Sequence, residues 1–123
     1  MAAPNIINAT SIVGKTVYDT DIDATASSFV TNSASSNKVF KINSLVISNI
    51  DGTNDATITA TLNSVGSGTL LSTLASTITV PSNSTLVIIS KDTAIYLEED
   101  REIRLTASAA GDLSGTCSYD EIS

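Results

Sequence analysis

Apolar and polar residues alternate along much of this chain, which is the pattern of a β-strand with one buried face. The clearest case is 57–63, where Ile58, Ala60 and Leu62 alternate with threonine and asparagine. Residues 85–91 are instead apolar on both faces, as in a strand covered on both sides. No segment of useful length repeats apolar residues at the 3.6-residue period of a helix. The pattern therefore predicts an all-β chain.

Turn-forming Gly, Pro, Asn and Asp residues recur about every ten positions and divide the chain into short strands. We expect strands at 10–18, 28–32, 38–50, 57–63, 69–80, 85–91, 95–97, 102–109 and from 113 nearly to the C-terminus. The alternation changes phase between Ile42 and Leu45, which predicts a β-bulge near residues 43–44 or a strand covered on both faces. The turn at 51–54 predicts a hairpin between the strands at 38–50 and 57–63.

These strands predict one antiparallel β-sandwich of about eight short strands, either a jelly roll or immunoglobulin-like. The length of 123 residues matches a single domain at 1–123. Residues 1–12 are less regular, and we expect them to form an extended N-terminal arm.

Composition narrows the class of partner. Only 15% of residues are charged and 4% aromatic, and 19 Ser and 17 Thr supply most of the polarity. The net charge is −7, with the six Lys and Arg scattered, which argues against binding to nucleic acid or to anionic membranes. The apolar runs are too short to cross a bilayer, and the first residues predict no Sec-type signal peptide.

The inventory of reactive side chains argues against catalysis. Because the chain has no histidine, it has no histidine base, no histidine-containing triad and no histidine-ligated zinc. The single cysteine, Cys117, lies on the expected core face of the last strand, which predicts a buried structural thiol rather than a nucleophile. No phosphate-binding glycine motif is present, so we expect no cofactor and no enzyme.

Two acidic groups remain. Asp19, Asp21 and Asp23 alternate in a loop that could converge on Ca²⁺, but the loop lacks the glycine and glutamate of an EF-hand. A solvated or partner-facing charge patch is the favoured interpretation, and these three aspartates are the one metal candidate. The run at 98–100 is interpreted as an exposed turn, since adjacent carboxylates usually point apart.

Tyrosine combines a large apolar body with a polar tip, which makes the three tyrosines candidate interface anchors, or else residues that close the ends of the sandwich. Together with the apolar arm and the acidic loop, they give the following candidate interface residues: Ile6, Ile7, Ile12, Tyr18, Asp19, Asp21, Asp23, Tyr96 and Tyr119.

Several strand and turn motifs carry a resemblance to a known group of proteins. They are KVFKINSL at 38–45, NIDGTN at 49–54, LVIISKDT at 86–93 and IYLEE at 95–99, with Val80 and Pro81 between them. Over most of its length, from Ala2 to the end, the chain resembles small structural proteins encoded by tailed phages of marine bacteria and cyanobacteria.

The resemblance implies a virion component that is made in the host bacterial cytoplasm and has no catalytic residues. We expect a capsid decoration or cement protein, a homo-oligomer such as a trimer, that binds the major capsid protein or other virion proteins. The arm and the loop at 18–23 are expected to order against the shell. A neck, tail or fibre-adaptor component remains open, as does a carbohydrate-binding or adhesin module.

Overall fold

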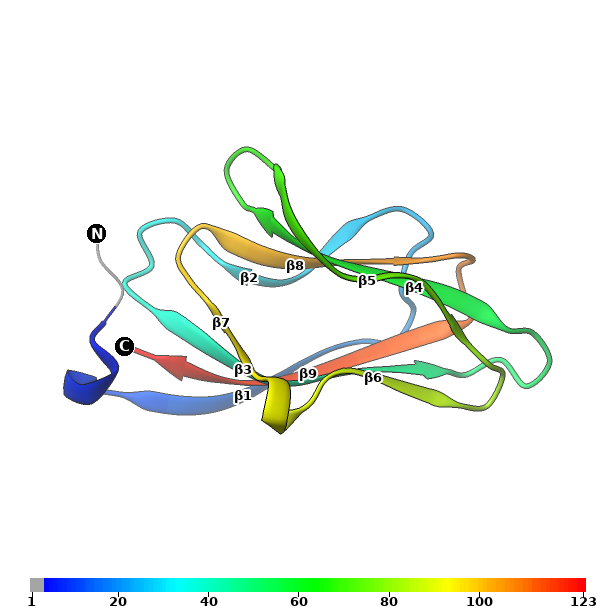
Figure 1. Ribbon diagram of the computed structural model, residues 1–123, viewed down its shortest axis with the longest axis horizontal. Helices are drawn as coiled ribbons and strands as arrows, with labels where there is room; N and C mark the ends of the chain where they lie inside the picture. Colours follow the sequence, from blue (N-terminus) through cyan, green and yellow to red (C-terminus); the bar gives the residue numbers. More distant parts are fainter. Residues whose placement is uncertain (1–3) are drawn as a thin grey trace.

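Residues 4–123, which the computed structural model describes, form two antiparallel β-sheets packed face to face (Figure 1). The strands are β1 (Ile12–Asp19), β2 (Ser27–Asn32), β3 (Val39–Asn49), β4 (Ala56–Ser64), β5 (Leu70–Val80), β6 (Thr85–Ile89), β7 (Ile95–Leu97), β8 (Arg101–Ala107) and β9 (Leu113–Ile122). Two single-turn 3-10 helices, η1 (Ile6–Asn8) and η2 (Lys91–Thr93), complete the fold. The predicted all-β sandwich is confirmed.

The chain passes repeatedly from one sheet to the other. The first sheet has the order β1-β9-β3-β6, with β7 also paired to β3, and the second has the order β2-β8-β4-β5. With the short β7 set aside, the other eight strands wind into the two sheets in the order of a jelly roll. The hairpin predicted across residues 51–54 is wrong, because β3 and β4 lie in different sheets. The turn there carries the chain between the layers, and β4 pairs with β5 instead.

The phase change in β3 is a true bulge. The register between β3 and β9 shifts between Ile42 and Ser44, as the sequence predicts. The shift lets β3 bury Phe40 and Ile42 on one side of the bulge and Leu45 and Ile47 on the other. All four side chains therefore reach one aliphatic core.

Gly115 lies where the inner faces pack tightly. A Cβ atom at this position would lie 3.3 Å from Cδ1 of both Ile22 and Leu105 and 3.5 Å from Cδ1 of Ile47. A larger residue would require the nearest of these branched side chains to shift by a few tenths of an ångström in a densely packed core. Ile22 comes from the loop after β1 and is fully buried, so this large apolar side chain fixes the loop to the core.

Two buried asparagines hold the crossings between the sheets. Asn32, at the end of β2, donates through Nδ2 to the carbonyl oxygens of Lys38 (2.9 Å) and Leu97 (3.0 Å). Asn49, at the end of β3, donates to those of Asn54 (3.0 Å) and Val80 (2.8 Å). Each side chain thus satisfies carbonyls in its own crossing loop and in a distant strand, which a buried backbone requires.

A carboxylate pins three neighbouring strands of the first sheet. Glu121 on β9 pairs with Lys15 of β1 at 2.9 Å and with Lys38, just before β3, at 2.6 Å. The hydrogen bonds from Lys38 and Lys15 hold the pKa of Glu121 below its usual value. The stabilisation is therefore present above the pKa that the carboxyl has in the unfolded chain, and it is lost as pH falls through the lower folded pKa.

We expect the Glu121→Gln variant to lose up to about 1 kcal/mol of unfolding free energy near pH 7, since the pairs are partly exposed. The difference from the wild type should shrink to nothing in acid, below the folded pKa. Urea unfolding at a series of pH values measures this. Glu98→Gln, at an exposed position, is the matched control, and a difference that persists unchanged in acid would contradict the prediction.

Candidate functional site

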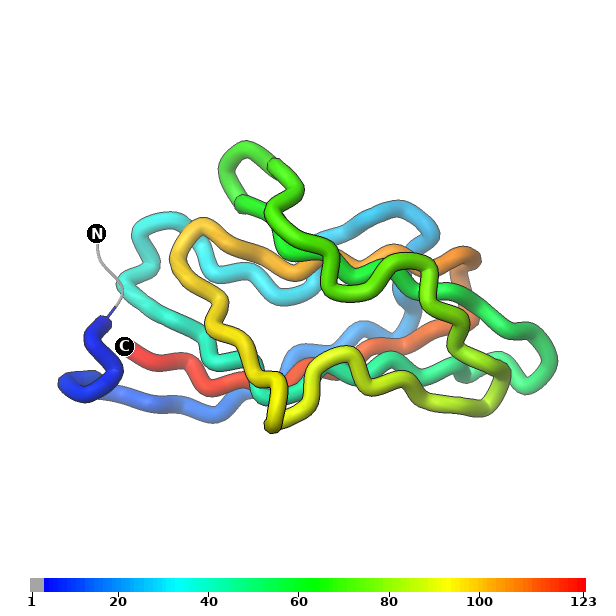
Figure 2. Tube along the Cα trace, viewed as in Figure 1, coloured from blue at the N-terminus to red at the C-terminus, as the bar shows by residue number. Residues whose placement is uncertain are grey.

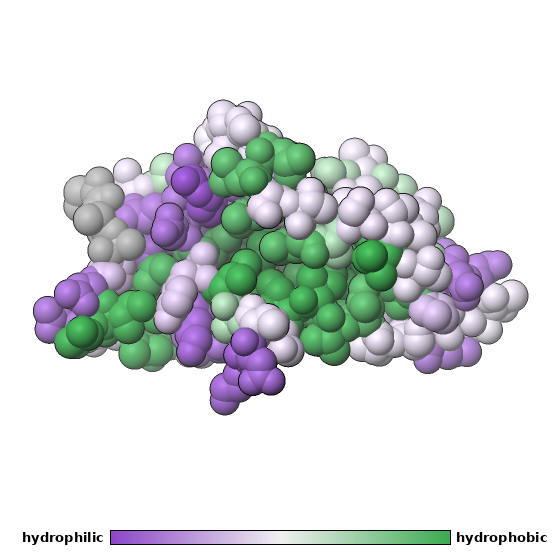
Figure 3. Space-filling view, in the orientation of Figure 1, coloured by the Kyte–Doolittle hydropathy of each residue, from purple (hydrophilic) through white to green (hydrophobic). Residues whose placement is uncertain are grey.

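One long side of the sandwich is open. The second sheet ends there at β5 and the first ends at β6, and these two edge strands face the viewer in Figures 1 and 2. The space-filling view shows a broad apolar surface between them (Figure 3). Side chains of the interior face of the sandwich reach this surface, and among residues 4–123 no strand covers them.

The pairing of the strands identifies these inward side chains. Ile78 of β5 is paired with Ile58 of β4, which is fully buried, yet Ile78 is itself 42% exposed. Leu86 of β6 is paired with the fully buried Ile47 and is only partly covered. They contribute to a groove of about 470 Å³, here called the β5–β6 groove. Its lining residues are Thr73, Leu74, Ala75, Ser76, Ile78, Leu86, Val87 and Ile88.

The groove lies within the longest uncharged stretch of the chain. Residues 56–90 contain no Asp, Glu, Lys or Arg, although the whole chain has 13 acidic and six basic residues. The stretch includes all of β4, β5 and β6. An uncharged occupant therefore meets no charged side chain in the groove lining.

The two edges of the groove differ in regularity. The register between β4 and β5 shifts at three places, and Thr77 has a φ of 49°, a conformation that β-branched residues rarely adopt. The Thr77 amide donates to Oγ1 of Thr59 (3.1 Å) rather than continuing a ladder. Such bulges protect an edge strand against pairing with another chain. The β6 edge is the more regular one at this side.

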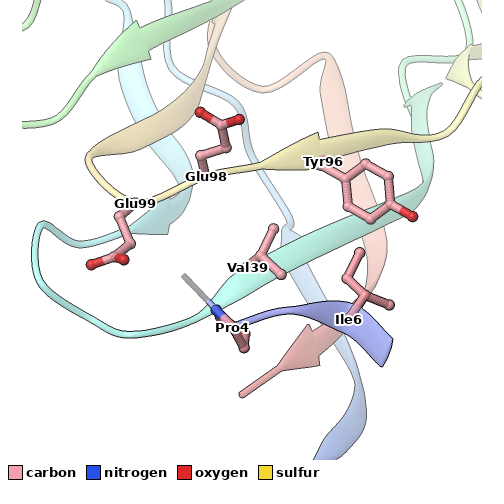
Figure 4. Close-up of a pocket in the computed structure, with 6 residues that line it drawn as sticks. All are labelled: Pro4, Ile6, Val39, Tyr96, Glu98 and Glu99. Atoms are coloured by element: carbon pink, nitrogen blue, oxygen red, sulfur yellow. The ribbon is translucent and has the colours of Figure 1, made fainter. Parts of the chain in front are cut away.

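A second, slightly smaller hollow lies beside the N-terminal segment. Its volume is about 410 Å³, and Pro4, Ile6, Val39, Tyr96, Glu98 and Glu99 line it. Figure 4 shows Ile6 and the Tyr96 ring near Val39, while the carboxylates of Glu98 and Glu99 point away from each other. The diverging carboxylates fit the expected exposed turn, in which Glu99 accepts a hydrogen bond from the Asn37 amide at 3.3 Å.

The candidate interface residues differ in exposure. Ile6, Ile7 and Ile12 are exposed at one end of the first sheet, and Tyr18 and Tyr96 are also exposed. Tyr119 faces inward instead, with its ring centroid 4.8 Å from that of Phe40, and it closes an end of the sandwich.

The acidic loop is held open to solvent. The Asp19 carboxylate accepts from the Asp21 amide (3.0 Å), and that of Asp21 accepts from the Gly111 amide (2.6 Å). Ile22 points inward between Asp21 and Asp23, which are both exposed. Within residues 4–123, no three acidic or cysteine side chains are grouped so as to hold a metal ion.

Asp112, which the sequence did not single out, joins the same end of the molecule. Desolvation and the nearby carboxylate of Asp51 raise the pKa of Asp112. Hydrogen bonds from Asn54 and from the Thr53 amide lower the pKa of Asp51. The loops after β1, after β3 and before β9 thus gather negative charge at one end of the sandwich.

Cys117 lies wholly in the core, as its position in the pattern predicts. Burial raises the pKa of its thiol to about 12, so the reactive thiolate is scarce at neutral pH. We expect iodoacetamide at pH 8 to leave the native protein unmodified and to alkylate it fully in denaturing urea, as intact-mass spectrometry would show. Native alkylation at the unfolded rate would contradict this.

The groove was not predicted from the sequence. The strand at 69–80 was expected, but nothing local shows that its inner face lacks a cover. The signal that points to it is the uncharged run at 56–90 on an otherwise acidic chain.

In the part of the chain that the structure describes, no helix is long and apolar enough to cross a membrane.

Comparison with known sequences gives no family: no family model and no curated protein matches the chain. Solved structures do match. The structure titled "Bacillus endospore appendages form a novel family of disulfide-linked pili" aligns with a TM-score of 0.54 and 19% identity, covering 100% of this chain and 96% of that one.

Two virus structures align less well. A chain of infectious bursal disease virus, Gx strain, gives a TM-score of 0.45 and 10% identity over 93% of this chain and 33% of its own. A chain of the cyanophage Pam1 capsid gives a TM-score of 0.36 and 17% identity, over 99% of this chain and 91% of its own. At 19% identity the pilus likeness shows a shared fold alone, and it extends over the whole chain.

Proposed function

We propose that this protein is a non-enzymatic structural subunit of a tailed-phage particle, where it decorates the capsid at junctions between capsid subunits. The observation that carries shell binding is the acidic end of the sandwich beside the exposed ring of Tyr18. The open apolar side between β5 and β6 supports a further site of association. Large exposed apolar surfaces on soluble proteins mark sites of association with other proteins. The sequence motifs that resemble phage structural proteins support a phage particle as the place of this association.

The acidic end of the sandwich is the proposed shell-binding surface. It presents the loop with Asp19, Asp21 and Asp23, next to the exposed ring of Tyr18. An acidic patch with an aromatic anchor suits a basic junction on the partner, which would steer the encounter by charge. Many copies, each with a modest interface, add up over a shell to a large stabilisation.

The proposal is tested on particles assembled with and without this chain. We expect particles that carry it to resist heat and internal pressure better and to contain hundreds of copies by gel densitometry. Binding should weaken as salt rises, because charge steering is screened. Tyr18→Asp is expected to weaken binding, with Leu70→Asp as the control, since Leu70 is exposed at the other end of the sandwich. Equal resistance of both kinds of particle would overturn the proposal.

Copy number separates decoration from the alternative position in the virion. Three to a few dozen copies per particle would place the protein in the neck, tail or a fibre adaptor.

A further inference from the structure

In residues 4–9, the described part of the N-terminal arm and called the arm from here on, the hydrogen bonds are local to the segment. From Thr10 onward the chain is fixed, since the amides of Thr10 and Ser11 both donate to the Ser123 carbonyl, at 2.8 and 3.0 Å. Before that point the η1 turn is held by local bonds such as Ile7 N to Asn5 Oδ1 (3.0 Å), and none of its residues is buried. Ile7 is 91% exposed. The arm can therefore leave its position at small cost.

The β5–β6 groove has the complementary shape. It is concave, apolar and uncharged, and it exposes inward side chains such as Ile78 and Leu86 that a further apolar segment would cover. A single extended strand can lie along β6 and cover these side chains. Such strand addition to a free sheet edge is a recurring mode of recognition.

Charge selects the occupant. With a net charge of −7, two copies of this chain repel each other unless they meet where neither presents carboxylates. The runs at 1–14 and 56–90 are both free of charged residues, and they contain the arm and the groove respectively. The third long uncharged run, 24–37, is rich in serine and contains the β2 edge instead.

We propose that the arm of one copy lies in the β5–β6 groove of a second copy, as an added strand beside β6. Six extended residues span about 20 Å, and the five residues of β6 span about 17 Å, so the lengths agree. Ile6 and Ile7 project to opposite faces of an extended strand. Ile7 enters the groove, and Ile6 lies beside Val87, which is 55% exposed and stands outside the core.

This contact joins two different surfaces of the chain, so it is heterologous. The copy that gives its arm keeps a free groove, and the copy that gives its groove keeps a free arm, so further copies can add to form a ring or an open chain. The inference deepens the proposed structural role by naming a second copy as a partner. It rests on the proposed function only for the location of the assembly on the particle.

The test uses two charge variants, separately and mixed. Ile7→Asp places a charge on the arm and leaves the groove unchanged, while Ile78→Asp places a charge in the groove and leaves the arm unchanged. In sedimentation velocity the wild type should associate beyond the dimer as concentration rises. Each variant alone should show a dissociation constant at least tenfold higher. An equimolar mixture should form one-to-one heterodimers and nothing larger, because only one arm and one groove remain functional.

Ile50→Asp is the matched control, since it places the same charge at an exposed isoleucine outside both surfaces, and it should associate like the wild type. Circular dichroism and the thermal midpoint establish that each variant is folded. Three outcomes would overturn the inference: a wild type that stays monomeric, a variant that associates normally, or a mixture without heterodimers. A monomeric wild type would also fit an arm that lies in the groove of its own chain. Self-association without binding to particles would overturn only the proposed function, and particle binding by a strict monomer only this inference.

Discussion

The Asn49→Asp variant is expected to lose about 3–5 kcal/mol of unfolding free energy at neutral pH, a large fraction of the stability of an ordinary domain. Asn49 is 4% exposed, and its Nδ2 donates to two carbonyl oxygens. A carboxylate of the same shape has no hydrogens to donate, so it would face the carbonyls of Asn54 and Val80 as a buried, unpaired charge.

The loss depends on pH in a defined direction. Burial raises the pKa of the new carboxyl in the folded state, so the penalty is largest above that pKa and shrinks as pH falls towards the unfolded value of about 3.9. Urea unfolding at pH 7 and pH 4 measures the difference. Asn83→Asp, in an exposed turn, is the control and should change little. Equal stability of the Asn49→Asp variant and the wild type at pH 7 would show that Asn49 does not hold the crossing.

The second large effect is expected at Arg104, which pairs with a buried glutamate on the outer face of the second sheet. Glu102 is 3% exposed; it accepts from Nε of Arg104 and from Oγ of Ser28 at 2.7 Å. The turn between β4 and β5 approaches this pair, with Gly68 beside the guanidinium. Arg104→Met should cost about 3 kcal/mol, the lower end for a broken buried pair, because the arginine itself is partly exposed.

A double variant distinguishes loss of the ion pair from loss of packing. In Glu102→Gln/Arg104→Met no charge remains to be buried alone, so we expect most of the lost stability to return. The coupling free energy from the four proteins is measured by urea unfolding. A double variant as unstable as Arg104→Met would mean that the aliphatic part of Arg104, rather than its charge, stabilises this part of the second sheet.

Local features of the fold were predictable, and long-range ones were not. The bulge between Ile42 and Ser44 and the buried Cys117 follow from alternation along single strands. The supposed hairpin failed because a turn such as the one at 51–54 has the same composition whether the chain returns beside itself or crosses to the other sheet. What distinguishes the two here is the contact of Asn49 with Val80, 31 positions away.

The candidate site shows the same division. Alternation places Tyr119 on the same face as Cys117, and that face is the interior, so its inward position follows from the sequence. The exposure of Ile78 does not follow, because the alternation of β5 is that of any half-buried strand. Whether its inner face is covered depends on the separation of β5 from β6, and these strands are joined through a turn and do not pair.

The strand order also determines when the chain can fold during synthesis. The last two strands occupy inner positions, β8 between β2 and β4, and β9 between β1 and β3. Until β8 and β9 have left the ribosome, each sheet lacks an inner strand, and the earlier strands have no ladder partner across that gap. Folding therefore waits for these two strands, and such non-local pairing is slow. A chain that terminated before residue 113 would lack β9 and could not build the first sheet, so copies without β9 would not be available for assembly.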